Sequence, residues 1–82
     1  MESINERYFV YFKEIGVDKS FKLFDLNEGR TVGNVIYAPM YPESSLTKIK
    51  NFMLEVVKAQ PTIIFQLRPC GNRTKIVWTT EA

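Results

Sequence analysis

The sequence predicts an α+β fold, in which a largely antiparallel five-stranded sheet carries one helix on one face, in the order β-β-β-α-β-β. Three observations favour it. Apolar residues alternate over several short segments, as in half-buried strands. One longer segment repeats apolar residues at the spacing of an amphipathic helix. The 82 residues suit a single domain, 1–82, that buries one modest core.

Three strands are expected in the first half of the chain. Residues 7–15, RYFVYFKEI, are rich in the aromatic and branched side chains that favour strands. After a turn at 16–19, residues 20–26 alternate and predict a second strand. Residues 31–38 are expected to form the third strand, after the turn signal at 27–29. The first strand is apolar on both faces, so its sequence leaves open which face is buried.

A loop and the helix come next. Two prolines exclude regular strand pairing across residues 39–45, because proline cannot donate a ladder hydrogen bond. The helix is expected over residues 45–60, and Pro61 ends it. Only Leu54 is apolar and off the stripe. The apolar side chains that fall within one arc of about 140° are Leu46, Ile49, Phe52, Met53, Val56 and Val57.

A second hairpin closes the sheet. Strands at 62–68 and 74–80 are expected to pair across a four-residue loop at 69–72, since Pro69 has no N–H to donate. The expected cross-strand pairs are Arg68–Arg73, Leu67–Thr74, Gln66–Lys75, Phe65–Ile76, Ile64–Val77 and Ile63–Trp78. Because side chains alternate between faces, this register places Trp78 on the helix side, away from the arginines.

Composition gives little support to catalysis or to metal binding. Histidine is absent and Cys70 is the single cysteine, which removes the commonest general base and any intrachain disulfide. Cys70 is interpreted as a turn residue, and Ser44, Ser45 and Thr47 as residues of the helix cap. We therefore expect a protein that is not an enzyme and that has no catalytic residues, cofactor or metal.

A cytoplasmic location is expected. A single free thiol suits a reducing compartment. The first residues, MESINERYF, contain two acids and no apolar core segment, so no signal peptide is expected. No apolar run reaches the roughly 18 residues that a membrane span needs, and no membrane partner is expected.

One helix covers only one face of such a sheet, so the second face is expected to be open for a partner. The basic residues gather in the second half of the chain, where residues 46–82 carry six Lys/Arg against two Asp/Glu. Candidate partner-binding residues lie on the open face, at the basic hairpin tip and in the proline-rich loop. They are Phe9, Tyr11, Ile64, Val77, Arg68, Arg73, Lys75, Met40 and Tyr41.

These residues favour a small accessory or inhibitory factor that occludes the surface of a target protein, a type of domain frequent among phage and mobile-element products. Aromatic and arginine side chains are the favoured anchors of protein interfaces. Two alternatives use the same face. Single-stranded nucleic acid would stack its bases on the aromatics while cations hold phosphates. A homodimer would pair two open faces or two sheet edges.

Overall fold

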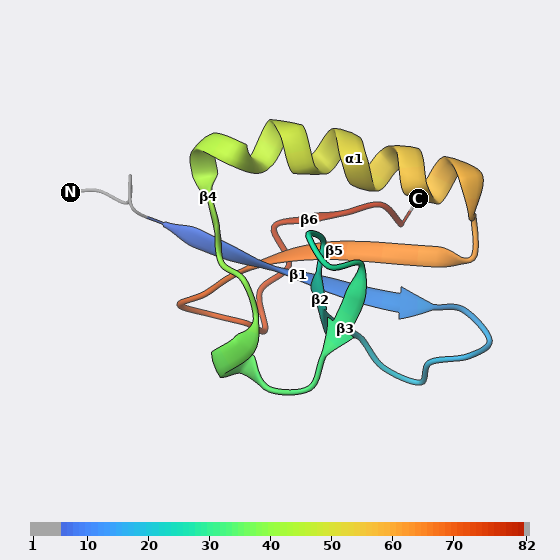
Figure 1. Ribbon diagram of the computed structural model, residues 1–82, viewed down its shortest axis with the longest axis horizontal. Helices are drawn as coiled ribbons and strands as arrows, with labels where there is room; N and C mark the ends of the chain where they lie inside the picture. The colour runs from blue at the N-terminus through green and yellow to red at the C-terminus, as the bar shows by residue number, and fades with distance from the viewer. Residues whose placement is uncertain (1–5, 82) are drawn as a thin grey trace.

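The computed structural model describes residues 6–81 and has the predicted α+β architecture, a sheet with one helix on one face (Figure 1). The strands are β1 (Arg7–Glu14), β2 (Lys22–Asp25), β3 (Arg30–Val32), β4 (Tyr41–Pro42), β5 (Ile63–Pro69) and β6 (Trp78–Thr79). The helices are α1 (Leu46–Ala59) and two 3-10 turns, η1 (Val35–Tyr37) and η2 (Glu43–Ser45). The sheet order is β3-β2-β1-β5-β6, with every pair antiparallel.

The core lies between α1 and the sheet. The even-numbered residues of β1 and the odd-numbered residues of β5 point toward the helix, as the alternation of side chains along a strand requires. Met53 of α1 and Leu67 of β5 are completely buried there. At the β2 side of this core, Phe12 stacks on Phe24 at 4.8 Å between ring centroids, and Phe65 contacts both rings at 5.7 to 5.8 Å.

α1 agrees with the predicted helix to within one residue at each end. Leu54 is half exposed, as its place off the apolar stripe predicts. Phe52 departs from the prediction, because it belongs to the stripe and is nevertheless 51% exposed. The hairpin of β2 and β3 stays apart from the helix at this point and leaves hollows beside Phe52. None of the helices within residues 6–81 is long and apolar enough to cross a membrane.

The predicted third strand is wrong beyond residue 32. β3 ends at Val32, and the side chain of Asn34 accepts a hydrogen bond from the backbone N–H of Ile36, which starts the turn η1. The prediction that prolines prevent pairing in the following loop also needs correction. Tyr41 and Pro42 form the two-residue β4 beside the first residues of β1, giving six strands instead of five.

The predicted register of the last hairpin is wrong by four residues. Leu67 pairs with Trp78 instead of Thr74, and residues 70–77 form an irregular connection. Two successive turns consume this length, because Asn72 donates its N–H to the Pro69 carbonyl at 3.1 Å and accepts two bonds from Thr74 through its side chain. An even shift preserves the face of each side chain, so Trp78 lies on the helix side as predicted.

Candidate functional site

The face of the sheet away from α1 is largely covered from within the chain. Phe9, Tyr11 and Ile64, three of the predicted contact residues, retain 6%, 7% and 8% of their exposure. The connections that follow β1, β3 and β5 lie on this side of the sheet (Figure 1). The expectation of a bare sheet face is therefore wrong at these three positions, which offer a partner little surface.

Arg68 makes several of the contacts that cover this face of the sheet. Its guanidinium lies over the ring of Tyr11 at 4.1 Å and over that of Phe21 at 5.6 Å. Its Nε and Nη2 donate to the Oε1 of the buried Gln66 at 3.1 and 2.7 Å. Its Nη1 donates to the backbone carbonyl of Arg73 at 3.1 Å. The structure thus brings Arg68 and Arg73 together. The contact is a hydrogen bond from the Arg68 side chain to the Arg73 backbone, which anchors the β5–β6 connection, and the two residues do not form the predicted cross-strand pair.

The other predicted residues of the hairpin tip are accessible. Arg73, Lys75 and Val77 are exposed on the β5–β6 connection, and Val77 keeps 42% of its surface. The backbone N–H of Val77 donates to the Leu67 carbonyl at 3.0 Å, which ties the end of the connection to β5. The connection therefore presents one arginine and one lysine from a backbone that is held at both ends.

The two residues predicted in the proline-rich loop have opposite environments. Met40 is 52% exposed. Tyr41 is buried, and its hydroxyl oxygen accepts a hydrogen bond from the backbone N–H of Leu26 at 3.1 Å. Burial raises the pKa of the Tyr41 phenol above its ordinary value. Tyr41 consequently connects β4 to the end of β2, and Met40 is the residue of this pair that a partner can reach.

The sequence did not indicate two apolar side chains in η1 that are even more exposed than Met40. Ile36 and Tyr37 of η1 are 74% and 75% exposed. Their backbone is nevertheless ordered by hydrogen bonds, since Tyr37 N–H donates to the Asn34 carbonyl at 3.0 Å and Ala38 N–H to the Val35 carbonyl at 3.1 Å. The sequence signal for this turn is Gly33-Asn34, because asparagine side chains cap such turns. Ile36, Tyr37 and Met40 together are called the η1 tip below.

Two neighbouring hollows connect the η1 tip to the β5–β6 connection. Tyr37 and Arg30 line a hollow of 260 Å³ at β3. A hollow of 490 Å³ shares part of β3 and extends to Arg73. The residues that line this larger hollow are Tyr11, Phe21, Lys22, Leu23, Thr31, Val32, Gly33 and Arg73. Its lining is apolar and cationic, and contains no carboxylate.

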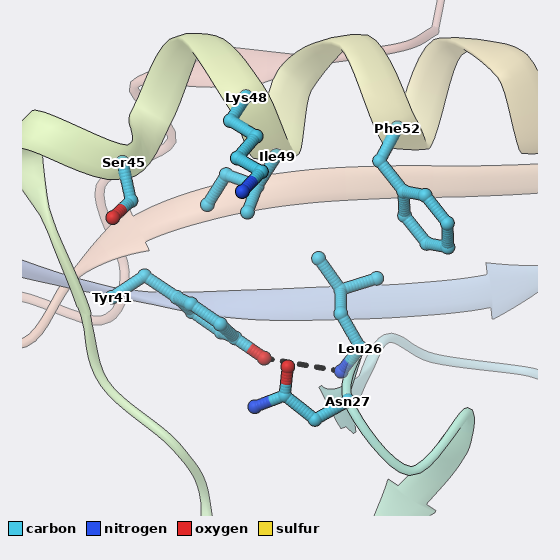
Figure 2. A pocket seen from close by; sticks show the side chains of 7 residues that line it. All are labelled: Leu26, Asn27, Tyr41, Ser45, Lys48, Ile49 and Phe52. Atoms are coloured by element: carbon cyan, nitrogen blue, oxygen red, sulfur yellow. Dashed lines mark hydrogen bonds between the residues drawn. The ribbon is translucent and has the colours of Figure 1, made fainter.

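A second site lies on the helix side of the sheet. Two hollows of 390 and 360 Å³ share Leu26 and Phe52, and separate α1 from the β2–β3 hairpin. Figure 2 shows the first of them, with Phe52 and Ile49 reaching down from α1 toward Leu26, and with Tyr41 below. We call this pair of hollows the α1 groove.

Reactive groups are sparse at both sites. Burial raises the pKa of the half-buried Cys70 thiol and outweighs the opposite influence of Arg7 and Arg73. The thiol is therefore protonated at neutral pH, which disfavours its use as a nucleophile. Within residues 6–81, no three His, Cys, Asp or Glu side chains are grouped so that they would hold a metal ion.

Comparison with protein-family models, with curated proteins and with solved structures finds no match to this chain. Function must therefore be inferred from the chain's own geometry.

Proposed function

We propose that the protein is a small binding module without enzymatic activity, an accessory or inhibitory factor that occludes part of a target protein. The observation that supports this most is the η1 tip. Ile36 and Tyr37 project into solvent from a backbone that is already fixed by hydrogen bonds. A contact surface ordered before binding loses little conformational entropy when a partner arrives. Tyrosine and methionine are also enriched at protein interfaces.

Charge supports an acidic partner segment. Arg30 and Arg73 line the two hollows beside the η1 tip, and within residues 6–81 neither forms an ion pair with a carboxylate. Lys22 is paired with Asp18 at 3.2 Å. Asp25 is the one acid that lines either hollow. Its Oδ1 accepts hydrogen bonds from the backbone N–H groups of Asn27 and Glu28 in the β2–β3 turn. A target segment that alternates apolar and acidic side chains would complement this surface.

The two alternative functions find less support in the geometry. Nucleic acid would stack several bases on rings of one face, but Phe9 and Tyr11 are buried, which leaves Tyr37 as the exposed ring on that side of the sheet. A homodimer through sheet edges requires long unpaired strands, and the edge strands β3 and β6 have three and two residues. Occlusion of a protein target therefore remains the best supported of the three functions.

The test is affinity capture from lysate of the native host, carried out with matched variants. Wild-type protein is expected to retain a partner that the double variant Ile36→Ser, Tyr37→Ser releases. Val17→Ser is the control, because Val17 is also apolar and 70% exposed but lies in the β1–β2 connection. Calorimetry with the purified partner then measures the loss, expected to be at least tenfold in Kd for two interface anchors. Equal capture by the double variant, or equal loss with Val17→Ser, would refute the proposal.

A further inference from the structure

The α1 groove has a chemistry of its own, which the proposed function does not use. Its two hollows share Leu26 and Phe52, so they adjoin each other beside the helix, and the pair is also called the channel below. Their volumes of 390 and 360 Å³ fall in the range of small-molecule sites, about 300 to 1,000 Å³. The two parts of the channel differ in polarity, and this difference defines what it would bind.

The part near the start of α1 is a cluster of four polar side chains, each of which can donate a hydrogen bond. Ser45, Lys48, Asn27 and Tyr41 line it together (Figure 2). Tyr41 is only 8% exposed, and its hydroxyl accepts from Leu26, while within residues 6–81 its hydroxyl hydrogen has no acceptor. No carboxylate lines this hollow, and the first turn of α1 contains no acid. The cluster is named the donor pole.

An anion at the donor pole would satisfy several groups at once. Lys48 has no carboxylate partner within residues 6–81, and it stands in the first turn of α1, where the helix dipole is itself positive. A carboxylate placed here would neutralise that local excess of positive charge. It would also accept the unused hydrogen of the Tyr41 hydroxyl, which is buried.

Apart from Glu14 and Gln60, the side chains that line the rest of the channel are apolar. Phe52 and Leu26 join the donor pole to the second hollow, whose apolar lining also includes Phe12, Phe24, Val56, Ile63 and Phe65. Glu14 is the one acidic residue in the lining of either hollow, and it belongs to the hollow that lacks Lys48. The channel therefore combines a cationic pole with a long apolar wall, and a negative charge lies only in the second hollow.

We propose that the α1 groove binds a free medium-chain carboxylate, with its head at the donor pole and its chain along Leu26 and Phe52 toward Val56. The helix from Lys48 to Val56 rises by about 12 Å, roughly the length of an extended chain of ten carbons. The chain covers the exposed ring of Phe52, which the fold leaves uncovered. The head forms an ion pair with Lys48 and accepts from the Tyr41 hydroxyl.

The experiment titrates the ¹⁵N-labelled full chain with decanoate, decanol and decyltrimethylammonium, the two ions below their micelle concentrations and decanol below its solubility limit. The three probes share one chain length and differ in the charge of the head. Decanoate is expected to bind about tenfold more tightly than decanol, with the cation weakest, and to shift amide signals of α1 and of residues 26–29. Octanoate, two methylenes shorter, is expected to bind about tenfold more weakly than decanoate.

Two single-charge variants isolate the donor pole. Lys48→Gln is expected to weaken decanoate binding about tenfold and to abolish its advantage over decanol. Lys58→Gln, which removes another exposed charge from the last turn of the same helix, is expected to change neither. Equal affinities for the three probes, equal losses in both variants, or signal shifts confined to the η1 tip would each overturn the proposal.

Discussion

Arg68 shows how one side chain can change the character of a whole surface. Its guanidinium stacks on Tyr11, binds the amide oxygen of Gln66 and holds the carbonyl of Arg73. The guanidinium of Arg68 therefore binds groups of the same chain, and it covers the ring of Tyr11. The sequence placed Arg68 on the face away from the helix, but it left open whether Tyr11 lies on that face, because residues 7–15 are apolar on both sides. It could not show that they would bind each other, since that depends on the path of the β5–β6 connection.

Replacement of Arg68 by Met is expected to lower the free energy of unfolding by about 1–2 kcal/mol. The variant loses the cation–π contact and leaves the buried Gln66 side chain without its donor. Arg73→Met is the control, and because its side chain is exposed, its expected effect is within about 0.5 kcal/mol. Urea unfolding with an unchanged slope measures both. Similar small effects of the two substitutions would show that Arg68 has no structural role.

Among the elements, α1 and β1 were predictable because their signals are local. The helix has an unbroken apolar stripe and ends before Pro61, and β1 is a dense run of aromatic and branched residues. η1 was mistaken for strand because Val35, Ile36 and Tyr37 have strand propensities. Hydrogen bonds to the side chains of Asn34 and Asn72 stabilise turns in η1 and in the β5–β6 connection, the two segments that were predicted wholly or partly as strand. Strand propensity takes no account of such hydrogen bonds.

Burial differs between the apolar stripe of α1 and its outer face, so substitutions at two adjacent residues are expected to differ strongly in their effect on stability. Met53→Ala is expected to lower the free energy of unfolding by about 2–5 kcal/mol, because Met53 is completely buried against the sheet. Leu54→Ala, next to it but 48% exposed, is expected to cost less than about 1 kcal/mol. Thermal or urea unfolding of the two variants tests this. Comparable losses would mean that α1 is rotated from the orientation described.

The molecule as a whole has two faces that differ in chemistry. The helix side holds the α1 groove, with a donor pole and an apolar wall. The other side holds the η1 tip and the cationic hollows. The sequence correctly predicted one helix on one face, but the inference that the second face must be bare did not account for connections long enough to fold over it. Two of those connections, the one after β3 and the one after β5, carry the exposed groups that a partner would meet.

The most direct test of the central claim is a footprint of the bound partner. Cross-saturation NMR of the complex between the ¹⁵N-labelled chain and its captured, purified partner would show which amides lie at the interface. The account predicts that saturation reaches residues 33–40 and 70–76 and spares the outer face of α1 around Leu54 and Lys58. A footprint centred on that outer face, or on the β6 edge, would contradict it.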